Sequence, residues 1–191
     1  MSSEGSISTY MTKQSGPGML GLRGLDHYGM TVPNVDAAVG FFCDVLGCEE
    51  LYKLGTFRVE EGDWMTEHLN VHARAEITNM RMIPCGQGGN VELFEYEAPD
   101  KRHEQPRNSD NAGHHLCFYV DNIFDAVEYL KGHGVTILGE PSLNSGAEAG
   151  EYWCYFLAPW GAQLEQVSYA AGRGYEQHTA KRLWDARNPE T

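Results

Sequence analysis

The sequence predicts an α+β fold made of two similar halves, each with the element order strand, helix and three strands. A short β-prone run that opens with a histidine occurs twice, at 27–32 and at 115–120. An amphipathic helical pattern follows each of these runs. The halves also end alike, because a glycine stands four positions before Glu92 in one and four before Glu165 in the other. A repeated unit of this kind is typical of a duplicated module.

In the first half, apolar residues recur at the three- and four-residue spacing of a helix with one apolar face. They are Val35, Ala38, Val39, Phe42, Val45 and Leu46. Asn34 or Asp36 can cap the start of this helix, and Gly47 stands where a C-terminal glycine belongs. Strand-like runs follow at 49–56, 76–83 and 90–96.

The second half repeats this order over a shorter length. Its helical pattern is Ile123, Ala126, Val127 and Leu130, with Asn122 as the expected N-cap and Gly132 at the C-terminal end. The strand-like runs are 135–139, 152–158 and 162–168. The extra length of the first half falls near 57–72, a polar stretch.

Segments whose apolar residues show neither the helical nor the strand spacing flank and join the halves. Residues 1–18 are rich in Ser, Gly and Thr, and we expect a flexible tail there. The expected division is a first module at 19–98, a linker at 99–111, a second module at 112–169 and a C-terminal extension at 170–191.

Composition excludes several classes of function. The chain has 14 Lys and Arg against 27 Asp and Glu, a formal net charge of −13 at pH 7. Such a chain is poorly suited to bind nucleic-acid phosphates or an anionic membrane surface. No apolar run approaches the roughly 20 residues that cross a bilayer. The five cysteines form no CxxC pair, so reduced thiols in a cytoplasmic protein are expected.

One histidine and one glutamate from each half form a candidate metal site. Because side chains alternate along a strand, His27 and His115 are expected on the face opposite the helices. Glu92 and Glu165 lie mid-strand among apolar neighbours, where a carboxylate is rare unless it is paired or bound to a metal. Any one of these residues alone is commonly structural, but their matched recurrence favours a pseudo-twofold site. His114 competes with His115, and the strand phase favours His115. Such ligands suit Zn, Ni, Co, Mn or Fe.

Four short motifs recur in order: Leu25-Asp26-His27, Val91-Glu92-Leu93, Gly113-His114-His115 and Leu164-Glu165. With them the chain resembles the vicinal oxygen chelate superfamily, which includes glyoxalase I, methylmalonyl-CoA epimerase, extradiol dioxygenases and the fosfomycin and bleomycin resistance proteins. The resemblance implies paired βαβββ modules that form a cupped mixed sheet around one divalent metal. The implied ligands are His27, Glu92, His115 and Glu165.

The resemblance is to the glyoxalase I and epimerase branches in particular. It implies a metal-dependent lyase or isomerase that moves a proton next to a carbonyl or enolate oxygen of a small-molecule substrate. Glu165 is one candidate base. Glu76, near where epimerase relatives carry a catalytic glutamate, is the other, or else an exposed strand residue. Trp160 departs from the Asp or Lys often found before the second glycine. A homodimer is expected.

Two other functions compete with this one. An extradiol-type Fe(II) dioxygenase needs two histidines, one carboxylate and open positions, and Glu92 as a fourth ligand disfavours it. A non-catalytic binding or resistance protein of the same fold needs no metal, so four intact ligands count against it. Four cations are either anion-binding groups for a substrate or ordinary surface residues, namely Lys53, Arg58, Arg74 and Arg81.

Overall fold

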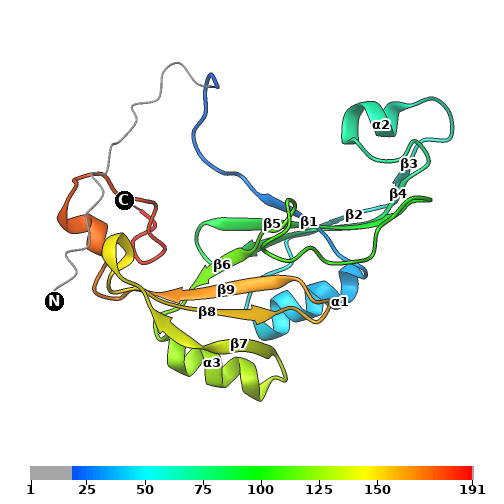
Figure 1. Cartoon of the computed structure of the whole chain (residues 1–191). Coiled ribbons are helices and arrows are strands. Elements are labelled where there is room, and N and C mark those ends of the chain that lie inside the picture. Colours follow the sequence, from blue (N-terminus) through cyan, green and yellow to red (C-terminus); the bar gives the residue numbers. More distant parts are fainter. Residues whose placement is uncertain (1–18, 191) are drawn as a thin grey trace.

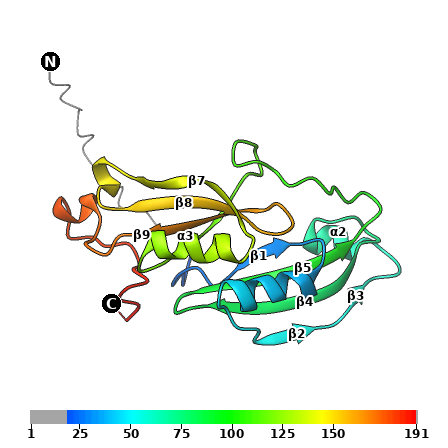
Figure 2. The same cartoon turned by 90° about the horizontal axis from the view of Figure 1, so that it is seen from below.

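The computed structural model describes residues 19–190 and has two β-sheets, each with a helix on one face (Figure 1). The expected tail at 1–18 lies outside the described residues. The view from below in Figure 2 shows α1 and α3 on the same side of the molecule. The expected α+β fold with two βαβββ units is therefore confirmed.

The first sheet has the strand order β1-β5-β4-β2, and β3 also pairs with β4. Its half of the chain contains β1 (Tyr28–Thr31), α1 (Val35–Gly40), a π-helical turn η1 (Phe41–Val45), β2 (Tyr52–Leu54), β3 (Phe57–Arg58), α2 (Trp64–Leu69), β4 (Glu76–Cys85) and β5 (Gly89–Glu97). The strand β1 is parallel to β5, and the other pairs are antiparallel.

The second sheet has the matching order β6-β9-β8-β7, with β6 parallel to β9. Its half contains β6 (Leu116–Tyr119), α3 (Ile123–Gly132), β7 (Thr136–Leu143), β8 (Tyr152–Leu157) and β9 (Gln163–Ser168). Two 3-10 turns lie at Gly146–Glu148 and Gly174–Gln177. The second of these is the helical element of the C-terminal extension.

Both long helical patterns begin at the expected caps. The side chain of Asn34 accepts a hydrogen bond from the backbone N–H of Ala37 at 2.7 Å, and that of Asn122 accepts one from Phe124 at 3.0 Å. The free backbone N–H of Val35 donates to Glu95 on β5 at 2.8 Å, which fixes the start of α1 to its sheet.

A shared core holds the two halves together. It contains Phe42 and Leu93 from the first half and Phe156 and Leu164 from the second, all almost fully buried. Trp160, in the turn between β8 and β9, packs on the ring of Phe42 with centroids 6.2 Å apart and on that of Phe41 at 5.8 Å. The tryptophan that departs from the family pattern therefore joins the modules.

The polar stretch of the first half folds into β3 and α2, elements that the sequence pattern does not reveal. Figure 1 shows α2 on the side of the first sheet opposite α1. The guanidinium of Arg74 fastens this segment, since it donates to the carbonyls of Val59 and Gly62.

Over residues 19–190, no helix is both long and apolar enough to span a bilayer. The five cysteines are free.

Candidate metal centre

The first predicted pair of ligands meets at the start of β1. His27 immediately precedes this strand, and Gly29 pairs in register with Glu92 on β5. The imidazole Nε2 of His27 lies 3.2 Å from Oε2 of Glu92. The carboxylate side chain is 17% exposed, so it is largely withdrawn from water and held by the histidine.

The second pair repeats this geometry in the other sheet. His115 precedes β6, and Cys117 pairs in register with Glu165 on β9. Nε2 of His115 lies 3.0 Å from Oε2 of Glu165, whose side chain is 14% exposed. Each half of the chain thus builds the same histidine–glutamate pair from equivalent strands.

The outer nitrogen of each imidazole also has a partner. Nδ1 of His27 lies 2.7 Å from the carboxylate of Asp26, and this hydrogen bond raises the pKa of His27, with the charge of Glu92 adding to it and burial opposing it. Nδ1 of His115 lies 3.2 Å from the amide of Asn108, a linker residue. Such partners orient a histidine ligand and fix its tautomer.

Metal binding through Nε2 requires the tautomer in which Nδ1 carries the proton and Nε2 has a free lone pair. Asp26 supports this form, because it accepts the Nδ1 proton of His27. For His115 the amide of Asn108 must present its oxygen to Nδ1, an orientation related by a simple amide flip. Asp26 could be found from the sequence because it precedes His27 in the first motif. Nothing in the composition of the linker distinguished Asn108 from its neighbours.

The donor distances suit a divalent cation. Two ligands on adjacent positions of a cation with bonds of about 2.1 Å stand about 3 Å apart, and both pairs have this separation. Within residues 19–190, however, no three or more His, Cys, Asp or Glu side chains converge on one possible metal position. The four predicted ligands therefore form two separate pairs, one on each sheet.

His114 does not join either pair. Its Nδ1 lies 2.7 Å from the carbonyl oxygen of Ala112, and its ring lies 5.5 Å from that of Tyr28. The histidine that pairs with Glu165 is therefore His115, and its role as a metal ligand stays a prediction.

Glu76, the second candidate base, is also placed apart from both pairs. It lies at the start of β4, where it pairs in register with Glu97. Odd-numbered residues of β5 face α1, as Glu95 does, whereas Glu92 points to the other face. The carboxylate of Glu76 lies 3.6 Å from Arg58.

A β-bulge explains this placement. Met82 pairs with Glu92, and strict alternation from Met82 would bring Glu76 to the same face. The register shifts between Ile77 and Asn79, so the alternation slips by one residue. A bulge reverses the facing of every residue beyond it.

Two residues that the sequence analysis did not select lie beside Glu165. Burial and the charge of Glu165 raise the pKa of the Cys117 thiol and of the Tyr155 hydroxyl. The ring of Tyr155 also lies 5.1 Å from that of His115. Both groups stay protonated at neutral pH, and the Cys117 thiol hydrogen-bonds the carboxylate of Glu165. Their signal in the sequence is only strand alternation.

Three of the four candidate substrate cations, Arg58, Arg74 and Arg81, have protein partners. Arg81 is 5% exposed and lies 2.8 Å from both Asp36 and Glu50, on the α1 side of the sheet. Arg58 pairs with Glu60 at 2.7 Å. These residues and Arg74 have structural contacts that account for them.

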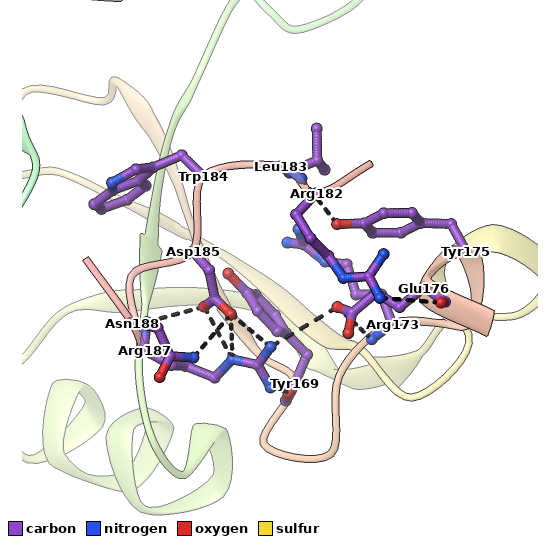
Figure 3. Close-up of a pocket in the computed structure, with 10 residues that line it drawn as sticks. All are labelled: Tyr169, Arg173, Tyr175, Glu176, Arg182, Leu183, Trp184, Asp185, Arg187 and Asn188. Carbon is purple, nitrogen blue, oxygen red and sulfur yellow. Dashed lines mark hydrogen bonds and ion pairs between the residues drawn. The ribbon is translucent and has the colours of Figure 1, made fainter. Parts of the chain in front are cut away.

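A cavity of about 720 Å³ lies in the C-terminal extension (Figure 3). The guanidinium groups of Arg173 and Arg187 lie 3.8 and 4.7 Å from the ring centroid of Tyr169. Asp185 binds Arg187 at 2.7 Å, and this lowers the pKa of Asp185 from 3.8 to about 2. The cavity is lined by the extension and Tyr169, and none of the four predicted ligands belongs to it.

The fold and the two pairs define a class of proteins with paired βαβββ modules and matching histidine and glutamate positions. The model of the glyoxalase/bleomycin resistance protein/dioxygenase superfamily matches residues 24–165. The chain belongs to this superfamily.

Among characterised proteins, the chain is similar to a 2-epi-5-epi-valiolone epimerase from Actinomyces sp. The two are 44% identical over 172 residues, which cover 89% of this chain and 92% of the relative. Solved structures share the fold. A glyoxalase family protein from Bacillus cereus is 18% identical, with a TM-score of 0.60 over 79% of this chain and 98% of its own. The fosfomycin resistance protein FosX from Listeria monocytogenes is 15% identical, with a TM-score of 0.52 over 82% and 98%.

Proposed function

We propose that the protein is a divalent-metal-dependent epimerase that moves a proton on the carbon beside the carbonyl of a polyhydroxylated cyclic ketone. The observation that carries this proposal is the duplicated pair of a histidine and a withdrawn glutamate on equivalent strands. The similarity to a protein named as a 2-epi-5-epi-valiolone epimerase supports the isomerase class and the kind of substrate.

The proposed ligands are His27, Glu92, His115 and Glu165, and Zn, Ni, Co, Mn and Fe all suit this donor set. A bound cation of this kind polarises a carbonyl and stabilises negative charge on its oxygen. The charges of the two carboxylates balance the charge of a dication, so the site favours an uncharged substrate.

We assign the proton transfer to Glu165, which takes the proton from the carbon beside the carbonyl. The protonated thiol of Cys117 hydrogen-bonds this carboxylate, and Tyr155 lies opposite it on β8. A proton delivered from solvent to the other side of the planar enolate inverts the carbon centre, and Glu165 releases the proton that it took to solvent. The step is redox-neutral and consumes no oxygen.

We further propose that a second copy of the chain completes the site. Each chain offers two half-sites, and β1 and β6, which follow the two ligand histidines, are edge strands of their sheets. Exposed apolar residues precede β1, namely Met19, Leu20, Leu22 and Leu25. A twofold dimer brings the first half-site of one chain to the second half-site of the other.

The cytoplasmic location stays a prediction.

The test is solvent-deuterium exchange into 2-epi-5-epi-valiolone, after elemental analysis of protein purified without added metal. Protein loaded with its native ion should catalyse exchange without oxygen, and its chelator-treated form should not. No exchange with any of the five metals would contradict the proposal. Turnover that strictly requires Fe(II) and oxygen would establish a dioxygenase instead.

A further inference from the structure

A second cavity, of about 940 Å³, adjoins the first half-site. Gly29 and Thr31 of β1 and Phe94 and Tyr96 of β5 line one side of it. Gly29 pairs directly with Glu92, and the charge of Glu92 contributes to the raised pKa of Tyr96. The cavity therefore continues the sheet face that carries the first pair.

The other walls come from segments particular to the first half. The end of α2 and the residues after it contribute Leu69, Asn70 and His72, and the linker contributes Lys101. Asn70 ends α2 in the left-handed conformation, with φ of 54°. The second half has no counterpart of this segment, because its β6-to-β9 region is shorter and contains no such helix.

Local contacts determine which N–H groups of His72 and Lys101 can donate to a ligand in this cavity. The backbone N–H of Arg74 donates to Nδ1 of His72 at 3.0 Å, so the ring proton of His72 is on Nε2. Nζ of Lys101 donates to the carbonyl of Tyr96 at 2.6 Å and lies 3.7 Å from Glu97. An ammonium has three N–H bonds, which leaves one for a ligand.

The balance of the lining favours an uncharged polyol. Lys101 and Asp100 are the charged residues among those that line it, and their charges cancel. Thr31, Tyr96 and Asn70 supply neutral hydroxyl and amide groups, while Phe94 offers an apolar surface to ring C–H bonds. A phosphate or carboxylate would instead call for an excess of cations.

The equivalent end of the second sheet is lined differently, because Tyr169 and the C-terminal extension border the 720 Å³ cavity there. By the repeat, Tyr119 matches Thr31 and Tyr169 matches Tyr96. The rings of Tyr119 and Tyr169 lie 4.8 Å apart, and Arg173 and Arg187 of the extension cover Tyr169. Ion-paired arginines and carboxylates therefore dominate the lining at the second end, whereas most of the lining at the first end is uncharged.

We propose that the 940 Å³ cavity binds the ring hydroxyl groups of a polyhydroxylated cyclic substrate, with His72 and Lys101 as specificity-determining residues. This inference rests on the proposed function, and it names the part of the site that recognises the substrate rather than the part that moves its proton.

The experiment measures KM and kcat for 2-epi-5-epi-valiolone by deuterium exchange in the metal-loaded full chain. His72→Ala should raise KM on the order of 10-fold, the effect of one lost hydrogen bond, with kcat and metal content unchanged. His72→Gln keeps an N–H donor and should recover part of the loss. Lys101→Gln should also raise KM. His68→Ala is the matched control, because His68 stacks on Trp64 in the same segment and does not line the cavity.

Each outcome separates the inference from the function on which it rests. Absence of exchange in the wild-type protein would overturn the proposed function. Exchange in the wild type with KM unchanged in His72→Ala, or a loss confined to kcat or metal content, would overturn the inference alone. myo-Inositol, an uncharged cyclic polyol, should compete with the substrate. Competition by inorganic phosphate in its place would also contradict a polyol site.

Discussion

At the scale of single residues, Glu165 is the proposed base and lies beside His115, whereas Glu76 lies beside Arg58. Glu165→Gln should slow deuterium exchange on the order of 10²-fold or more, the usual size of a lost general base. Glu76→Gln should stay within a few-fold of the wild type, because Glu76 lies on the opposite face, beside Arg58. Exchange rates of both variants at equal metal content decide the point, and a larger loss in Glu76→Gln would contradict this placement.

Asp185 gives a pH-dependent contribution to stability with a definite sign. Its pKa falls from 3.8 to about 2 in the folded protein because Arg187 binds the carboxylate. A lowered pKa means that the ionised form favours folding above the ordinary value. This contribution is lost as the pH falls from about 4 through 2.

Asp185→Asn should therefore lower the melting temperature at pH 7 more than at pH 3. Thermal unfolding followed at several pH values measures this difference. Asp110→Asn is a suitable comparison, because Arg107 lowers the pKa of Asp110 in the same way at an exposed position. An equal effect of Asp185→Asn at every pH would contradict the assignment.

The residue types of the site were predictable, but their partners were predictable only in part. His27, Glu92, His115 and Glu165 recur at matching places, and alternation puts each histidine on the same face of its sheet as its glutamate. The side of the sheet on which Glu76 lies depends on a β-bulge, which no residue pattern in β4 predicts. Asn108 lies in a segment without periodicity, so its contact with the second pair requires the folded chain.

At the scale of elements, α1 and α3 were predictable because apolar spacing and an asparagine cap agree for each. The strand β3 has only two residues and α2 has six, too few for a periodic pattern to stand out. Tertiary contacts, such as the stacking of Trp64 on His68 and the bonds of Arg74, fix this segment instead.

The attachment of α1 to β4 depends on Arg81, a buried cation between Asp36 and Glu50. Arg81→Ala should lower the free energy of unfolding by about 1–3 kcal/mol, because hydrogen bonds to charged groups contribute more than neutral ones. Urea unfolding measures it. Arg58→Ala removes an exposed pair on the same sheet and should cost less than about 1 kcal/mol. Equal losses in the two variants would argue against a special role for the buried arginine.

The C-terminal extension is fastened to the first module by one tryptophan. A Cβ atom built on Gly88, in the turn between β4 and β5, would overlap the indole ring of Trp184. Gly88→Ala should therefore displace the ring and release the end of the extension. Limited proteolysis should cut it faster in Gly88→Ala and in Trp184→Ala, with the core intact. Gly86→Ala tests the same turn without this contact, although its φ of 65° adds strain.

At the scale of the whole molecule, the two half-sites predict how variants complement each other. His27→Ala and His115→Ala should each lose bound metal, and His114→Ala should keep it. When the two inactive variants are mixed and allowed to exchange subunits, half of the dimers carry both chains, and each of these has one intact site. Metal binding and exchange activity should return to about a quarter of the wild-type level.

Light scattering on the same samples establishes the oligomeric state. A monomer at micromolar concentration, or no recovery after subunit exchange is verified, would show that the two pairs belong to one chain. The modules themselves were predictable from the repeat, but the separation of the pairs was not. It depends on how the halves pack through Trp160 and the shared core.

The segment around α2 and the C-terminal extension each change one half of a duplicated frame and leave the other unchanged. A frame with perfect twofold symmetry would hold a bound ketone in two equivalent poses, related by rotation about the axis. Each pose would present the opposite side of the reacting carbon to a given carboxylate. In the proposed site the two ends have different linings, so they would favour a single pose, and the two otherwise equal glutamates would take different chemical roles. The divergence of the halves would thus give the proposed epimerase its stereochemical sense.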